Sequence, residues 1–276
     1  MIRIRCLGLI VATALLAGSV VGTPVLDQAA QAQSGQPAPA PGARSPLSPP
    51  ETNRVQAEAF KRGYEAYYRR EYEKAAAIWT QLADQGHVKS MNNIGTMYAQ
   101  GKGVSRNYSL AVFYYRRAAT QNDARAAYNL AIAYQRGRGV EQSDAEAVAW
   151  YRKAAERGLV EAMNAISWIL ATSSDFTVRD GAQAARWAEA ALQRKTSSKN
   201  LATLAAAQAE LGEYNKAVAT IDQAIAYMRR EESRAGLLIA TEHELFGLLR
   251  EFGRADELFD LLERREFYAN GQATRD

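Results

Sequence analysis

The amino-acid sequence predicts an all-α protein, an α-solenoid built from stacked antiparallel helix pairs. Apolar residues recur at spacings of three and four, as in Leu130, Ala131 and Tyr134, and this spacing places them on one face of a helix. No alternating apolar and polar segment of useful length predicts a β-strand. A motif that recurs 36 residues apart is the second observation, because a fixed period of this size is typical of helical repeat arrays.

The recurring motif ends in glycine, a basic residue, glycine and valine. It reads YAQGKGV from Tyr98 to Val104 and YQRGRGV from Tyr134 to Val140. Self-similarity over four units predicts a solenoid in which each unit buries its apolar face only against its neighbours. The same offset places one large aromatic residue in each unit, at Trp79, Tyr115, Tyr151 and Trp187.

The glycines of this motif fit helix ends better than a phosphate-binding loop. No G-x-x-x-x-G-K-[ST] pattern is present, and no predicted strand precedes either motif. Gly101 and Gly137 are expected to end a helix in the left-handed conformation, which glycine adopts without steric cost. The second glycine would let the chain turn back, with the valine packed under the turn. The basic residues Lys102, Arg136 and Arg138 would lie near helix C-termini, where the dipole stabilises cations by about 0.3 to 1 kcal/mol.

One unit, from Ala126 to Gly158, carries the fullest set of recurring residues. They are Asn129, Leu130, Ala131, Tyr134, Gly137, Gly139, Val140, Ala147, the run WYRKAA from Trp150 to Ala155, and Gly158. This set resembles the SEL-one-like repeat, a relative of the tetratricopeptide repeat. The preceding unit matches almost as well. The resemblance implies a solenoid over residues 54–268 and a scaffold that binds a protein or peptide partner without catalysing a reaction.

Plainer tetratricopeptide spacing flanks these two units. A fourth unit, Glu161 to Ala191, keeps Trp187 but replaces the glycine turn with TSSDFTVRDG. A sixth helix pair, around Leu245 to Leu262, is expected to serve as a polar-faced cap.

The N-terminus has the features of an export signal. Residues 1–32 begin with Arg3 and Arg5, continue with an apolar stretch, and end in Ala30-Gln31-Ala32, which predicts a signal peptide cleaved after Ala32. The competing interpretation is an uncleaved membrane anchor, because the weakly polar run is long enough to span a bilayer. The expected location is therefore the periplasm or the exterior of a bacterial cell, with membrane attachment only if this segment stays uncleaved.

Two further segments are predicted to be disordered. Residues 33–53, QSGQPAPAPGARSPLSPPETN, are rich in proline, serine, glycine and alanine, and such a composition leaves little apolar surface to bury. We expect them to form a tether. Residues 269–276 are expected to form a disordered tail.

Composition argues against several classes of function. The single cysteine, Cys6, lies in the predicted signal peptide, so the mature chain would have no disulfide and no cysteine-based metal site. Only two histidines, His87 and His243, remain for metal binding or catalysis. A net charge of +4 gives little support to nucleic-acid binding. We expect a protein that is not an enzyme and has no cofactor. The remaining enzymatic alternative, a β-lactamase-like activity, is linked to family members whose paired cysteines are absent here.

The predicted binding site is a groove along the first helices of successive units. The tetratricopeptide register places these residues on its concave face: Phe60, Tyr64, Tyr67, Tyr68, Lys89, Asn92, Thr96, Gln100, Arg125, Tyr128, Arg136, Asn164 and Trp168. Interleaved aromatic and basic side chains suit an extended peptide with an acidic or aromatic feature.

Two alternatives to this groove remain open. Tyr64, Tyr67, Tyr68 and Trp168 would serve as stacking platforms for a cell-wall glycan such as peptidoglycan or another polysaccharide. In the other alternative, Phe60 and Tyr64 only pack the first helix.

Overall fold

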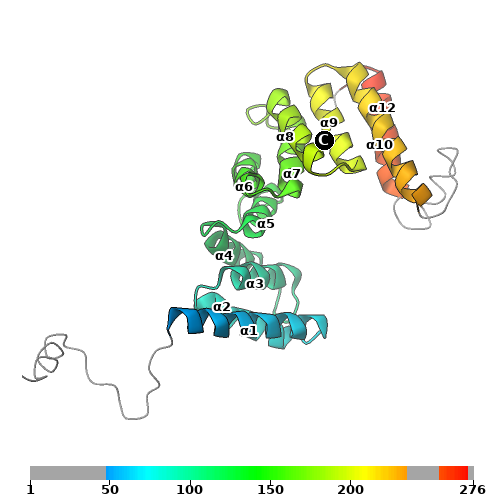
Figure 1. The fold of residues 1–276 in the computed structure, drawn as a ribbon. Coiled ribbons are helices and arrows are strands. Elements are labelled where there is room, and N and C mark those ends of the chain that lie inside the picture. Colours follow the sequence, from blue (N-terminus) through cyan, green and yellow to red (C-terminus); the bar gives the residue numbers. More distant parts are fainter. Residues whose placement is uncertain (1–47, 235–254, 273–276) are drawn as a thin grey trace, which may run out of the picture. The chain divides into compact units, whose positions relative to one another are not determined.

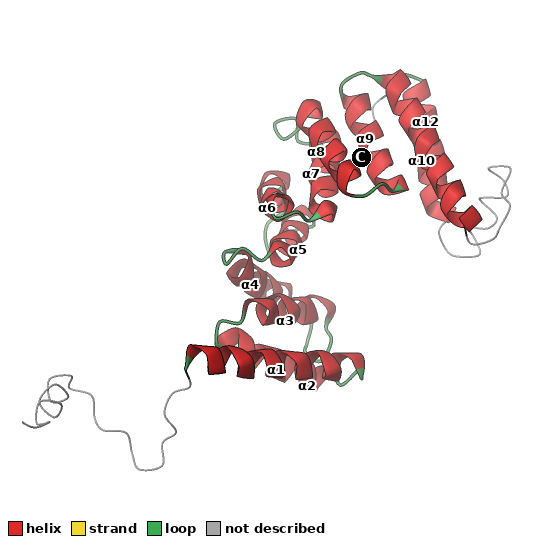
Figure 2. Ribbon diagram, viewed as in Figure 1, coloured by secondary structure: helices red, strands yellow, loops and turns green. Residues whose placement is uncertain are grey.

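The computed structural model describes residues 48–234 and 255–272. In these ranges the chain is helical and contains no strand (Figures 1 and 2). The all-α prediction is therefore confirmed for the described part. The predicted signal peptide, and the linker up to residue 47, lie outside it. No helix in the described ranges has both the length and the hydrophobicity that crossing a bilayer requires.

Each helix packs against the next one along the chain, which makes a series of helix pairs (Figure 1). Connections of three to eight residues join the two helices of each described pair. The helices are α1 (Pro49–Tyr68), α2 (Tyr72–Asp84), α3 (Val88–Gln100), α4 (Tyr108–Ala119), α5 (Ala124–Gln135), α6 (Asp144–Glu156), α7 (Val160–Thr172), α8 (Gly181–Arg194), α9 (Ser198–Glu210), α10 (Tyr214–Arg234) and α12 (Ala255–Ala269).

The helical region begins earlier than predicted. The backbone N–H and the hydroxyl of Ser48 both donate to the Glu51 carboxylate, at 3.0 and 2.7 Å. Pro49 lies in the first turn, where its missing N–H costs no hydrogen bond. Residues 49–53, assigned above to the linker, are therefore the start of α1, because a local capping arrangement outweighs their proline-rich composition.

The C-terminal end of the helical region also differs in detail from the prediction. Helix α12 ends at Ala269, one residue beyond the predicted limit. It supplies the second helix of the predicted sixth pair, whereas residues 235–254, which include Leu245, lie outside the described residues. The last four residues of the predicted tail lie outside them as well.

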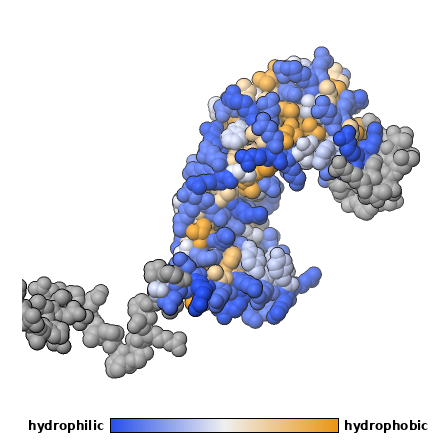
Figure 3. Space-filling view, in the orientation of Figure 1, coloured by the Kyte–Doolittle hydropathy of each residue, from blue (hydrophilic) through white to orange (hydrophobic). Residues whose placement is uncertain are grey.

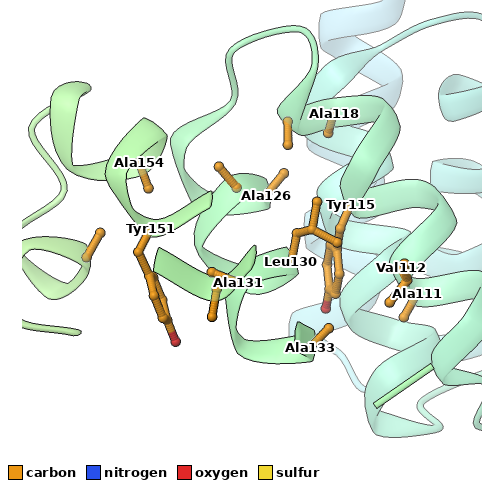
Figure 4. Close-up of a cluster of buried hydrophobic side chains, with 14 of the residues drawn as sticks. Ala111, Val112, Tyr115, Ala118, Ala126, Leu130, Ala131, Ala133, Tyr151 and Ala154 are labelled. Atoms are coloured by element: carbon orange, nitrogen blue, oxygen red, sulfur yellow. The ribbon is translucent and has the colours of Figure 1, made fainter. Parts of the chain in front are cut away.

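Aromatic residues from the second helices fill the core. Trp79 on α2, Tyr115 on α4 and Tyr151 on α6 are all buried. The rings of Tyr115 and Tyr151 lie on either side of α5, with Leu130 and Ala131 between them (Figure 4). Hydrophilic residues cover most of the face shown in Figure 3, and hydrophobic residues gather in smaller patches. The 36-residue aromatic period is thus the period of core packing.

Small residues on the first helices make room for these rings. A Cβ atom added at Gly63 would lie 2.3 Å from the Trp79 indole, and one at Gly95 would lie 2.8 Å from the Tyr115 ring. Such distances are far below van der Waals contact. The two helices of a unit therefore approach closely only because the first helix presents glycine at the point where it meets the ring.

The glycine turns act as helix ends, as predicted, and also allow a close contact between units. Gly101 ends α3 with φ +70°, and its N–H donates to the Met97 carbonyl at 2.8 Å. The second glycine of each motif lies against the start of the preceding unit's second helix. A Cβ at Gly103 would lie 2.3 Å from the Tyr72 backbone, and one at Gly139 would lie 2.5 Å from the Tyr108 backbone.

The basic residues of the motif pack on aromatic rings of the neighbouring unit. Lys102 Nζ lies 5.6 Å from the centroid of the Tyr72 ring, and Arg138 lies 5.5 Å from that of Tyr108. Lys102 Nζ also donates a hydrogen bond to the Tyr67 hydroxyl at 3.0 Å. Lys102 and Arg138 therefore join successive units through cation–π contacts.

Helix α3 begins at an unusual N-cap, His87. Its Nδ1 accepts a hydrogen bond from the Ser90 N–H at 3.3 Å and lies 2.8 Å from the Ser90 hydroxyl. Burial, and to a lesser extent the charge of Lys89, lowers the pKa of His87 below its ordinary value of 6.5. The neutral imidazole is the form that caps the helix, because the protonated ring has no acceptor.

We predict that Gly139→Ala lowers the free energy of unfolding by about 2 to 5 kcal/mol. The left-handed backbone costs alanine about 1 to 2 kcal/mol, and displacing the Tyr108 backbone adds about 1 to 3 kcal/mol. Gly86→Ala is the matched control, because Gly86 has φ +90° but no atom within 4 Å of the added Cβ. Urea denaturation of both variants measures the difference. Equal losses would contradict a close contact at Gly139.

We predict that His87→Asn removes part of the acid sensitivity of the fold. Because the folded pKa of His87 is depressed, the unfolded chain binds more protons below pH 6.5, and its contribution to stability is lost as pH falls below that value. Asparagine caps helices well and does not titrate. Denaturation curves between about pH 7.5 and 5 should show a smaller loss in the variant than in the parent protein. Since His243 is present in both proteins, its titration cancels, and parallel losses would refute this assignment.

Candidate functional site

A pocket of 380 Å³ lies along the first helices of successive units, and we call it the aromatic–amide pocket. It is lined by Tyr64, Tyr67 and Tyr68 of α1, Trp79 of α2, Asn92, Asn93, Thr96 and Met97 of α3, Arg125, Tyr128 and Asn129 of α5, and Leu159 and Glu161 at the start of α7.

Exposed tyrosine rings form the α1 side of this pocket. Tyr64 and Tyr68 lie one helical turn apart and stack with centroids 6.2 Å apart. Tyr68 is 80% exposed and Tyr64 is 38% exposed. Tyr67 is held more firmly, since its ring lies 5.8 Å from Trp79 and its hydroxyl accepts the Lys102 hydrogen bond. A bound side chain would therefore meet Tyr64 and Tyr68 first.

Carboxamide side chains form the middle of the pocket. Asn129 Nδ2 donates to Asn92 Oδ1 at 2.9 Å, which links α5 to α3. Asn93 Nδ2 is buried and has no hydrogen-bond partner among the described residues. A buried donor without a partner costs about 1 to 3 kcal/mol, which an acceptor on a ligand would recover.

The charges around the pocket are balanced. Arg125 and Glu161 both line it and are both exposed. Burial raises the pKa of Tyr128, and the Glu161 carboxylate raises it further, whereas Arg136 acts in the opposite direction. The repeat pattern predicted Arg125 for this site but not Glu161, although Glu161 lies 36 residues after Arg125 and holds the same position in its own unit.

The predicted groove residues do not form one continuous site. The aromatic–amide pocket brings together Tyr64, Tyr67, Tyr68, Asn92, Thr96, Arg125 and Tyr128.

The remaining predicted residues lie elsewhere. Phe60 is half-buried and packs inward, with its ring 4.7 Å from His87 and 5.0 Å from Tyr64. Gln100 lines a smaller pocket of 220 Å³ between α3, α4 and α5. Lys89 and Arg136 are exposed and line neither the aromatic–amide pocket nor that smaller one.

Asn164 and Trp168 line a separate cavity of 540 Å³, which we call the C-terminal pocket. Arg264 of α12 stacks on Trp168 at 4.2 Å and forms an ion pair with Asp260 at 2.8 Å. The other lining residues are Lys195, Ser197, Ser198, Lys199, Ala202, Thr203, Met228, Glu231, Glu257 and Leu261.

Some lining residues carried a signal in the sequence and others did not. Asn93 and Asn129 lie 36 residues apart, so the repeat register marks them. Leu159 at the junction of units, and Lys195 and Lys199 around the start of α9, follow no repeated pattern. Their place in a pocket depends on how neighbouring units pack.

The described residues were compared with the ligand sets of protein-bound metal ions. No group of three or more His, Cys, Asp or Glu side chains there is arranged to hold a metal ion.

Three segments of the chain are similar to a known repeat family. The Sel1 repeat family matches residues 88–123, 124–159 and 160–195, which correspond to the helix pairs α3–α4, α5–α6 and α7–α8. The match extends the predicted resemblance by one unit, because 160–195 keeps the family pattern although it lacks the glycine turn. No curated protein matches the sequence.

Solved structures show the same architecture. A Sel1 repeat protein from Oxalobacter formigenes is 27% identical, with a TM-score of 0.51, over 59% of this chain and 68% of that protein. A protective antigen of uropathogenic Escherichia coli, c5321, which displays an SLR fold, is 23% identical, with a TM-score of 0.57. That alignment covers 76% of this chain and 49% of c5321, so this chain spans about half the length of c5321.

Proposed function

We propose that this chain, a repeat protein of the Sel1 and tetratricopeptide type, is a non-catalytic scaffold that binds an extended segment of a partner protein in the aromatic–amide pocket. The observation that carries the proposal is the composition of that pocket. Its walls come from the first helices α1, α3 and α5 and the start of α7, so a segment lying across them would contact several units at once.

The pocket indicates what the partner segment offers. The exposed rings of Tyr64 and Tyr68 suit an apolar or aromatic side chain. The unpartnered Nδ2 of Asn93 suits a backbone carbonyl. An acidic residue of the partner would face Arg125, but Glu161 limits the charge complementarity, so we expect binding to depend only weakly on salt.

A cell-wall glycan is the second candidate, and the stacked rings of Tyr64 and Tyr68 favour it. However, Arg264 covers one face of Trp168, and Tyr67 is packed against Trp79. Fewer platforms are therefore open than the sequence indicated. Tyr68→Ala, which removes one of these rings, tests this candidate in sedimentation with purified peptidoglycan.

We further propose that the protein is exported, with residues 1–32 as the signal peptide. This proposal rests on the basic start, the apolar stretch and the Ala30-Gln31-Ala32 site.

We predict that Tyr68→Ala and Asn93→Leu each weaken partner capture by about tenfold, because each removes one contact worth roughly 1 to 2 kcal/mol. Cross-linking in intact cells, followed by mass spectrometry, measures the capture. Phe113→Ala is the matched control, since Phe113 is 51% exposed and lies outside this pocket. The Asn93 variant should also raise the free energy of unfolding, which separates a binding defect from a folding defect. Undiminished capture by both pocket variants would exclude the pocket as the binding site.

We predict that the mature protein begins after Ala32 and is recovered outside the cytoplasm. Cell fractionation and N-terminal sequencing measure both properties. Replacing Arg3 and Arg5 with glutamate should retain the full-length protein in the cytoplasm. Recovery of an uncleaved chain in the membrane fraction would support the anchor instead.

A further inference from the structure

We propose that the C-terminal pocket is a second binding site, which takes a small zwitterion: an amino acid or a short peptide with both ends unblocked. Lys195 and Lys199 would hold the carboxylate, and Glu231 would hold the ammonium group. The proposal concerns a different pocket from the partner site above and does not depend on it.

The carboxylate side of the pocket lies around the start of α9. Lys195 follows α8, and Lys199 is in the first turn of α9; both are exposed. Neither lysine makes an ion pair within residues 48–234 and 255–272. Ser197 caps the helix by accepting the Asn200 N–H at 3.1 Å. The first N–H groups of α9 and the helix dipole add positive potential at the same place.

A buried amide lies in the same pocket and is an independent sign of a ligand. Asn164 is 5% exposed, and its Oδ1 is buried with no donor among the described residues. Apolar residues around it, including Met228 and Leu261, are also buried and offer no hydrogen bond. The missing donor is one that an ammonium group or a peptide N–H of the ligand would supply.

The opposite charge comes from another part of the fold. Glu231, near the C-terminal end of α10, lines the pocket and makes no ion pair in the described ranges. Asp260 is already engaged, because the Arg264 guanidinium pairs with it, and Glu257, the third carboxylate of the pocket, also has an interaction partner. Glu231 is therefore the carboxylate that we assign to the ligand's ammonium group.

These charges favour a zwitterion over a simple anion. Lys195, Lys199 and Glu231 line one cavity without pairing with each other, so a molecule that carries both charges would bridge them. Its N–H would also meet Asn164 Oδ1, which an anion without a donor would leave unpaired. The volume of 540 Å³ lies within the range of small-molecule sites and is too small for a folded partner.

Calorimetry with the full-length protein at low salt tests the proposal, with alanine, di-alanine and tri-alanine as probes. The probe that binds most tightly is then tested with one end blocked, either as its C-terminal amide or as its N-acetyl form. Each block should weaken binding about tenfold, because it removes one charge-assisted contact. The indole N–H resonance of Trp168, assigned with Trp168→Phe, should shift on addition of the free form.

Charge variants identify which residue meets which end. Lys195→Gln with Lys199→Gln should abolish the difference between the free probe and its amide, and should leave the effect of acetylation intact. Glu231→Gln should abolish the difference between the free probe and its N-acetyl form, and should leave the effect of amidation intact. All three side chains are exposed, so these changes should not unfold the protein. Tyr68→Ala should leave probe binding unchanged, which separates this site from the aromatic–amide pocket.

Three results would overturn the proposal. One is binding of the blocked forms as tight as that of the free forms. A second is binding of acetate as tight as that of the best probe, which would indicate an anion site. The third is no binding of any probe below about 10 mM, which is weaker than about 3 kcal/mol of binding free energy.

Discussion

The contact between one large aromatic ring and a glycine or alanine on the facing helix is the constraint on which this structure depends. Trp79 requires Gly63, and Tyr115 requires Gly95, because a Cβ at either glycine would overlap the ring. The helices of a unit are short, and isolated helices of this length are marginal in water. Burial of these rings between helices therefore supplies much of the stability that the helices lack alone.

Close packing within units determines how units meet. Gly103 and Gly139 let each turn lie against the start of an earlier helix, and Lys102 and Arg138 cover the tyrosines found there. Successive first helices then face the same side, which brings Asn92 and Asn129 into hydrogen-bond contact. The aromatic–amide pocket thus follows from the same repeated contacts that form the core.

The two pockets differ in how far the repeat pattern predicts them. The aromatic–amide pocket contains residues in the 36-residue register, such as Asn92, Tyr128 and Glu161, together with Leu159 from a junction between units. Phe60 was predicted to line the groove together with the tyrosines of α1. Its ring instead packs against His87, because the start of the following helix covers it. Trp168 lies in the other pocket, where α12 covers one face of it with Arg264. The sequence predicted on which face of its helix each residue lies. It did not predict which residue of another helix packs against that face.

The sequence by itself determined the helical class, the 36-residue unit, the helix-ending glycines and the aromatic positions of the core. All of these features depend on local backbone preferences or on a repeated spacing of residues. Both can be found in the amino-acid sequence without knowledge of the tertiary structure. Only the tertiary structure decided that Ser48 and Glu51 start α1 inside a proline-rich segment, that Glu161 balances Arg125, and that Asn164 shares a cavity with Lys199 and Glu231. The physical reason is that a pocket forms from side chains of several helices, and their approach depends on packing distances that no repeated pattern records.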